Sequence, residues 1–247
     1  MRKVLQSIVI GAIAISFSSC EILDGAAESI KIDGTSGSDT SNKLTNQEVI
    51  SGLKEALTIG IRNAVDVTAV TDGFLANNEI MLPFPESANK MKEKALEWGL
   101  DGQVDKIVTT LNRAAEDAAR EAAPIFINAI KNMSVQDGFA ILRGGEGAAT
   151  EFLRKNTTGE LVTAFSPKVQ NSIEKVKLTQ YWEPVSTRYN QAMTFTGGDK
   201  VDTDLNKYVT EKAIDGLFTM VAKEENKIRK DPAARVTDLL SKVFGSL

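Results

Sequence analysis

The sequence predicts an all-α protein: a multi-helix, bundle-like single domain behind a flexible, lipidated N-terminal tether. Apolar residues recur at helical spacing through most of the chain from residue 45 onward. No segment alternates apolar and polar residues over the length of a strand, and the one strand-like piece, residues 80–82, is too short to seed a sheet. Capping residues, glycines and prolines separate the apolar series at positions where helices begin and end. These observations favour the all-α class.

Residues 1–19 are typical of a signal peptide. Arg2 and Lys3 precede an apolar stretch, residues 4–17, which is too short for a comfortable transmembrane helix. The triplet Ser18-Ser19-Cys20 resembles the lipobox of bacterial lipoproteins, although Phe17 stands where leucine is usual. In that family the cysteine is acylated and becomes the first residue of the mature chain. The alternative is a plain secretory signal followed by an incidental cysteine.

Residues 20–44 are expected to form the lipidated tether, because the segment 34–42 is small, polar and unable to bury a core. Several acyl chains on Cys20 would give a durable membrane anchor. Glu21 occupies the second mature position, where aspartate often retains lipoproteins at the inner membrane, so the resemblance points to the outer membrane, facing the periplasm. The all-α domain then spans residues 45–247.

The first half of the domain contains two long predicted helices. Thr45 and Glu48 form a capping box before a helix expected to reach residue 70. A loop at 71–85, a helix at 86–98 and a long helix at 102–133 follow. Pro124 lies inside the last of these helices, so we expect a kink or break near residues 120–124.

The second half is predicted to hold shorter helices and one long one. A short helix opens at Ser134 and ends at Gly144-Gly145. Capping signals at 157–160 and at Ser166-Pro167 predict separate helices after it. The remaining expected segments are helices at 146–155, 158–165, 167–177 and 179–191, a loop at 192–202, a long helix at 203–230 and a terminal helix at 231–244.

Composition excludes several kinds of chemistry. The chain has no histidine and one cysteine, so it cannot form a Ser-His-Asp triad, a histidine-bearing zinc site or an intrachain disulfide. The net charge of −4 argues against nucleic acid as a partner. The acidic segment 199–204 lacks the glycine and final glutamate of a calcium loop, and Gly144–Gly147 reads better as a turn than as an anion site. We expect no metal and no cofactor.

Two groups of polar residues stand out on the long helices. One group lies on the predicted helix 102–133, and the other lies near the C-terminus. The first of these helices carries an alanine stripe on its apolar face, made of Ala114, Ala115, Ala118, Ala119, Ala122 and Ala123. The candidates are Asn112, Arg113, Glu116, Glu224, Glu225, Arg229 and Arg235. If the two helices pack antiparallel, the groups could meet, with Glu116 paired to Arg113, Arg229 or Arg235. Surface ion pairs and a contact that fixes helix register are the favoured interpretation, and a polar functional site is the other.

Four stretches resemble an uncharacterised bacterial envelope family that is catalogued as a domain of unknown function. They are GLKEAL (52–57), LNRAAEDAA (111–119), MSVQDGFAILRGGEGAATEFLR (133–154) and YVTEKAIDGLFTMVAKEENKIRKDPAARVTDLLSKVF (208–244). The resemblance covers about residues 46–244 and implies an exported, often lipid-anchored, largely helical protein. It implies no activity, substrate or catalytic residue.

These observations favour a non-enzymatic envelope lipoprotein that binds a protein or small-molecule partner. One alternative is a hydrolase or lyase that uses paired carboxylates, with Glu116 and either Glu224 or Glu225 as the first pair to consider. Another is a carrier with an apolar cavity between its helices. An enzyme needs two carboxylates facing one cleft, a carrier needs a large apolar cavity, and a scaffold needs neither.

Overall fold

The computed structural model describes residues 45–175, 177–201 and 204–231, together with 237 and 241. All of them belong to one compact unit of the chain, residues 41–247. The predicted signal peptide, the tether with Cys20, Arg235 and most of the predicted terminal helix lie outside the described residues.

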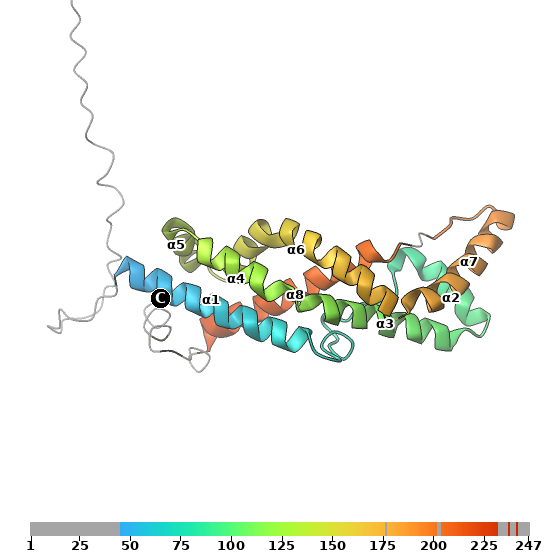
Figure 1. Ribbon diagram of the computed structural model, residues 1–247, viewed down its shortest axis with the longest axis horizontal. Helices are drawn as coiled ribbons and strands as arrows, with labels where there is room; N and C mark the ends of the chain where they lie inside the picture. Colours follow the sequence, from blue (N-terminus) through green and yellow to red (C-terminus); the bar gives the residue numbers. More distant parts are fainter. Residues whose placement is uncertain (1–44, 176, 202–203, 232–236, 238–240, 242–247) are drawn as a thin grey trace, which may run out of the picture. The chain divides into compact units, whose positions relative to one another are not determined.

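The described residues form eight α-helices and one short 3-10 helix, with no strand among them (Figure 1). In chain order they are α1 (Asn46–Thr68), η1 (Glu86–Ala88), α2 (Asn89–Glu97), α3 (Asp101–Ala119), α4 (Ala122–Asn132), α5 (Val135–Arg143), α6 (Ala148–Lys175), α7 (Leu178–Thr196) and α8 (Asn206–Lys230). The predicted all-α class is therefore confirmed. Within these ranges, no helix combines the length and the apolar character that a membrane crossing requires.

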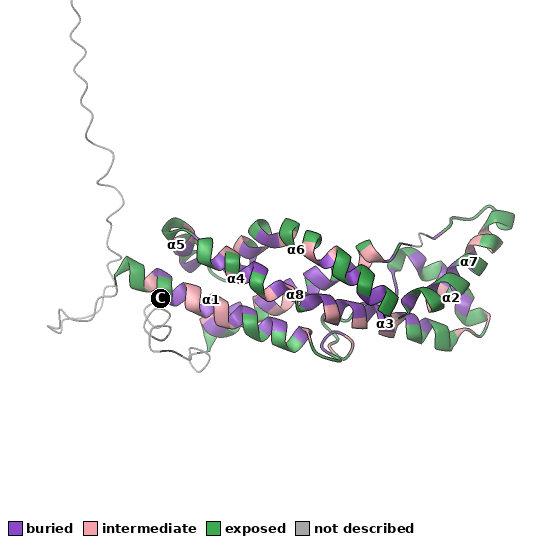
Figure 2. Cartoon of the chain, viewed as in Figure 1, coloured by how far each residue is buried: buried purple, intermediate pink, exposed green. Residues whose placement is uncertain are grey.

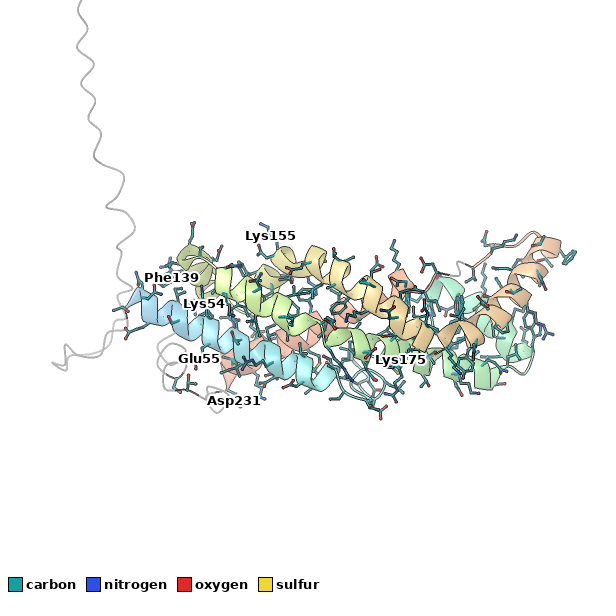
Figure 3. The ribbon with its side chains drawn as sticks, viewed as in Figure 1. Lys54, Glu55, Phe139, Lys155, Lys175 and Asp231 are labelled. Carbon is teal, nitrogen blue, oxygen red and sulfur yellow. The ribbon has the colours of Figure 1, made fainter. Side chains whose placement is uncertain are left out.

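Helix α1 begins where the sequence predicts. The amide of Glu48 donates to the hydroxyl of Thr45 at 3.2 Å, and the Glu48 carboxylate accepts from the Thr45 amide at 2.7 Å. This capping box satisfies amides that the first helical turn cannot pair internally. Beyond it, Lys54 crosses to α4 and donates to the backbone carbonyl of Lys131 at 2.8 Å (Figure 3).

The buried faces of the helices form one hydrophobic core (Figure 2). Helix α8 packs against α1, α3 and α6, and α3 also packs against α6 and α7. The alanine stripe of α3 is fully buried, so small side chains let these neighbours approach closely. Gly60 marks the corresponding approach of α1 to α8, since a Cβ there would lie 3.4 Å from the Cβ of Glu224.

The predicted break within residues 102–133 is present between α3 and α4. Helix α3 ends at Ala119 and α4 begins at Ala122. Pro124 therefore falls in the first turn of α4, where its missing amide costs no internal hydrogen bond. The sequence located this break correctly because proline is poorly tolerated inside a helix.

The prediction of separate helices at 146–155, 158–165 and 167–177 is wrong, because α6 runs without a break from Ala148 to Lys175. Thr157 is fully buried and donates to the carbonyl of Leu153 at 2.7 Å, so it is a helix-interior residue and not a cap. Pro167 lies inside the helix. Its neighbour Ser166 exchanges hydrogen bonds with the side chain of Asn206, which ties this part of α6 to the start of α8.

Two helix boundaries also differ from prediction. Helix α7 continues to Thr196 instead of ending near residue 191, and Gly197, with a φ of 73°, terminates it in the left-handed conformation. Helix α8 begins at Asn206 and not at residue 203. Residues 194–196 of this extension are exposed. Before it, Tyr189 is buried, and Asn190 binds both the amide and the carbonyl of Val201, which connects the segment after α7 to the helix.

Candidate functional site

The side chain of Asn112 on α3 forms hydrogen bonds with the backbone of the loop between α1 and η1. Its side-chain oxygen accepts from the Leu82 amide at 2.8 Å, and its side-chain nitrogen donates to the Leu82 carbonyl at 2.8 Å. The same nitrogen donates to the carbonyl of Val108. Asn112 and Leu82 are both buried, so these bonds replace the water that the loop backbone loses on burial. The strand-like piece of the sequence is thus held by a side chain and belongs to no sheet.

Glu116, one turn further along α3, holds the start of the same loop. One carboxylate oxygen accepts from the amides of Phe74 and Leu75, each at 3.2 Å, and the other accepts from Arg113 at 2.7 Å. Arg113 also donates to Asp72 at 2.7 Å. The hydrogen bonds with Glu116 and then Asp72 raise the pKa of the Arg113 guanidinium above its ordinary value. The Glu116 side chain is only 4% exposed, so its charge is balanced internally.

Glu225 of α8 caps the N-terminus of α6. Its carboxylate accepts from the amide of Ala149 at 3.0 Å, from the amide of Thr150 at 2.9 Å and from the Thr150 hydroxyl at 2.7 Å. Arg229 donates to it at 3.0 Å and also reaches the carbonyl of Ile141 at 2.9 Å. A carboxylate is stable at this place because the first turn of a helix offers unpaired amides and the positive end of the helix dipole. The amides at the N-terminus of α6, which could otherwise bind an anion, are therefore occupied by a carboxylate of the protein itself.

The expected single polar cluster is two clusters in the structure. Helices α3 and α8 pack against each other as predicted, and Arg113 is a partner of Glu116 as predicted. Arg229, another of the candidate partners of Glu116, binds Glu225 instead. Glu224 accepts from Asn63 of α1 at 2.8 Å. The two buried carboxylates serve separate joints because Glu116 binds amides of the loop after α1, whereas Glu225 binds amides in the first turn of α6.

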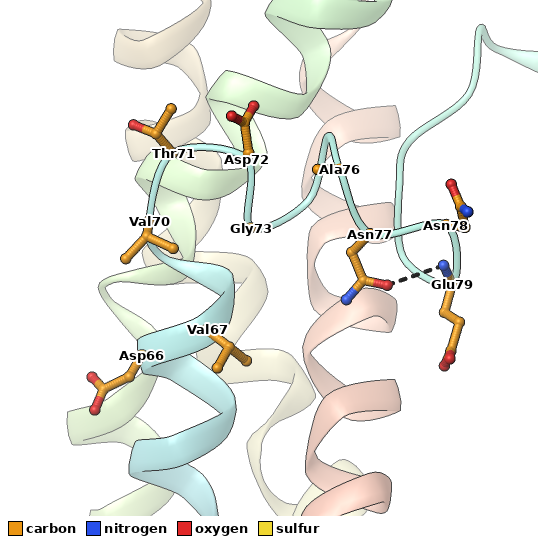
Figure 4. A pocket seen from close by; sticks show the side chains of 10 residues that line it. All are labelled: Asp66, Val67, Val70, Thr71, Asp72, Gly73, Ala76, Asn77, Asn78 and Glu79. Carbon is orange, nitrogen blue, oxygen red and sulfur yellow. Dashed lines mark hydrogen bonds between the residues drawn. The ribbon is translucent and has the colours of Figure 1, made fainter.

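A surface hollow at the C-terminal end of α1 was not predicted from the sequence. It is open to solvent, has a volume of about 660 Å³ and is lined by the last turn of α1 and by residues of the loop that Glu116 binds (Figure 4). Asp66 and Val67 come from α1, while Val70, Asp72 and residues 76–79 come from the chain that follows. The Asp72-Gly73 pair predicts a turn here, but no sequence signal shows that the turn borders a hollow.

The cavities between α1, α6 and α8 are much smaller. Two of them, both reaching Glu225 and Ile228, hold about 10 Å³ each. That is about the space that one water molecule occupies. Among the described residues, no three potential ligand side chains converge in a way that could hold a metal ion.

The fold and these hydrogen bonds define the class of protein: it is a helical domain in which two buried carboxylates connect segments of the same chain. Residues 43–245 match the model of the family described as Protein of unknown function (DUF4197), and the chain belongs to that family. Comparisons with curated proteins and with solved structures gave no match.

Proposed function

We propose that this protein is a cell-envelope lipoprotein whose helical domain is a non-enzymatic binding or scaffold module displayed in the periplasm. The anchor is proposed from the sequence of residues 1–20, where a charged start, an apolar stretch and the Ser-Ser-Cys triplet follow one another. Family membership is compatible with this proposal but assigns no activity.

One observation supports binding over catalysis: both buried carboxylates are fully engaged in structural hydrogen bonds. A histidine-independent hydrolase that uses two carboxylates needs them to face one cleft at about 5–9.5 Å from each other. Here Glu116 binds the amides of a loop and Glu225 binds the first turn of α6. Each carboxylate is buried and bound to backbone amides of this chain, which supports a structural role for both.

The carrier alternative receives less support. Sites for small apolar ligands usually enclose about 300–1,000 Å³ and bury most of the ligand. The cavities between α1, α6 and α8 hold about 10 Å³ each, and the larger hollow at the end of α1 opens to solvent. A solvent-facing surface is better suited to a partner's side chains than to a lipid that must leave water.

Metabolic labelling with palmitate tests the anchor. The full chain should incorporate label, and Cys20→Ala should not, because the chain has no other cysteine. Phe17→Leu is the matched control: it brings the segment closer to the usual lipobox and should keep the label. Fractionation of the labelled protein should place it with the outer membrane. Label that persists in Cys20→Ala would exclude the lipoprotein proposal.

A further inference from the structure

We propose that the hollow at the C-terminal end of α1, lined by the segment 66–79, binds a peptide segment of a protein partner in which cationic and aliphatic side chains alternate. This inference rests on the proposed function, because it names the partner chemistry of the proposed binding module. It uses three properties of the hollow: its exposed aliphatic side chains, its charge and its rigidity.

The first property is exposed aliphatic surface on the wall of the hollow. Val67 is 49% exposed and Val70 is 51% exposed, and both line the hollow beside Ala76 (Figure 4). Single exposed valines are ordinary on protein surfaces. Two of them three residues apart on the wall of one concavity give a partner's aliphatic side chain a place to bury apolar area.

The second property is charge. The lining contains the acids Asp66, Asp72 and Glu79 and no basic residue. Arg113 pairs with Asp72, and Lys223 of α8 pairs with Glu79 at 2.5 Å, so these two acids are partly neutralised. Asp66 has no ion pair among the described residues. It lies in the last turn of α1, where the helix dipole is negative and where no basic residue occurs.

Arg120 donates to the Ala69 carbonyl at 3.1 Å and satisfies one acceptor of this helix end. It is not among the residues that line the hollow. The acid that faces solvent without a partner is therefore Asp66, beside Val67 and Val70. A lysine or arginine of the partner would complement Asp66 while a neighbouring aliphatic residue covers the valines.

The third property is rigidity. Asp72 adopts the left-handed conformation with a φ of 67°, which is uncommon for a residue with a side chain, and its carboxylate accepts a hydrogen bond from Arg113, which also binds Glu116. Gly73 fits tightly against α1, since a Cβ would lie 2.5 Å from the carbonyl oxygen of Val67. A wall that is ordered before binding loses little conformational entropy when the partner arrives.

The position of the hollow also suits a tethered protein. The predicted tether joins the domain at the N-terminus of α1, and the hollow lies at the other end of this 23-residue helix. At a rise of 1.5 Å per residue, about 34 Å of helix separates the two points.

The experiment measures the binding of two fluorescein-labelled hexapeptides, Lys-Val-Lys-Val-Lys-Val and Glu-Val-Glu-Val-Glu-Val, to the full chain in a non-ionic detergent by fluorescence anisotropy. The lysine peptide should bind saturably, and the glutamate peptide should not. Val70→Lys should weaken lysine-peptide binding by about tenfold or more, since like charges in one hollow repel. Asp66→Asn should weaken it by a smaller factor and reduce its dependence on salt.

Val135→Lys is the matched control, because Val135 is similarly exposed, at 46%, but lies on α5. It should leave the affinity unchanged, and thermal melting of each variant should show that it is folded. Equal weakening by the two lysine substitutions, equal binding of the two peptides, or no saturable binding of the lysine peptide would overturn the proposal. Any of these results leaves palmitate labelling of Cys20 unaffected, so failure here is distinguishable from failure of the proposed function.

Discussion

Two joints in this domain use the same pair of side-chain types for different tasks. At the loop joint, Glu116 and Arg113 of α3 hold the segment after α1. At the helix joint, Glu225 and Arg229 of α8 hold the first turn of α6. Both carboxylates are almost fully buried, with side chains 4% and 3% exposed.

The two joints differ in the number of hydrogen bonds that each carboxylate accepts and in how far its arginine partner is exposed. Glu225 receives bonds from two amides, a hydroxyl and an arginine whose side chain is only 13% exposed. Glu116 receives bonds from two amides and from Arg113, which is 29% exposed and has Asp72 as a second partner. The same type of ion pair, glutamate with arginine, therefore stabilises a helix–helix contact in the core at one joint and the conformation of a surface loop at the other.

Glu225→Ala should produce the largest effect, a loss of about 4 kcal/mol in the free energy of unfolding, because it removes the shared acceptor of three buried donors and of the partly buried Arg229. Chemical denaturation of the purified chain measures it. Glu224→Ala is the control on the same helix, and since Glu224 makes one hydrogen bond with Asn63 and a 3.9 Å contact with Lys227, it should cost about 1 kcal/mol or less. Equal losses in the two variants would refute the capping role of Glu225.

Glu116→Ala should cost less than Glu225→Ala, about 2–3 kcal/mol, because Arg113 keeps its bond to Asp72 and can reach water. Its local effect should be specific: hydrogen exchange of the Phe74 and Leu75 amides should accelerate more than that of the α6 amides. Asp105→Ala, an exposed position on the same helix, should change neither quantity. An unchanged denaturation midpoint in Glu116→Ala would remove the structural role assigned to this residue.

The smallest expected effect concerns the other end of the loop and depends on pH. Tyr208 of α8 donates to the carbonyl of Pro83 at 2.8 Å, and burial, with a smaller contribution from Glu86, raises the pKa of Tyr208 to about 12. The folded protein keeps this proton more tightly than the unfolded chain, whose tyrosine pKa is about 10. The stabilisation is therefore full below pH 10 and declines as the pH rises from about 10 to 12.

Unfolding measured across this range should show that decline, and Tyr208→Phe should flatten the part of it that Tyr208 contributes. The variant loses the hydrogen bond to Pro83, so it should also be slightly less stable at neutral pH. Identical alkaline profiles for the two proteins would show that the Tyr208 proton is not linked to folding.

Helix class and most helix starts follow from local signals that the sequence displays. The capping box at Thr45 and the helix start at Ser134 are present in the structure, and Pro124 marks the break between α3 and α4. Similar signals failed within α6, where Thr157 and Pro167 lie inside one helix. Their local preference is outweighed because Leu161, Phe165 and Val169 are fully buried in the core, and these contacts favour a continuous helix.

The polar residues of the candidate site could be identified from the sequence, and so could Arg113 as a candidate partner of Glu116, but their backbone partners could not. Asn112, Arg113 and Glu116 stand out because they border an alanine stripe that must be buried. These partners are the backbone groups of Phe74, Leu75 and Leu82. Nearly every residue has the same backbone groups, so the sequence does not indicate which of them will bind a side chain. The same reason explains why the capping of α6 by a residue 76 positions away was not foreseen.

A double-mutant cycle on Glu116→Gln and Glu225→Gln tests the central claim, that the two carboxylates serve separate structural joints, most directly. Glutamine keeps the size of each side chain while removing its charge, so the folded state should survive both changes. If the joints are independent, the two losses in unfolding free energy should add, with a coupling below about 0.5 kcal/mol. A coupling above about 1 kcal/mol would mean that the two residues act in one site, and would contradict the account.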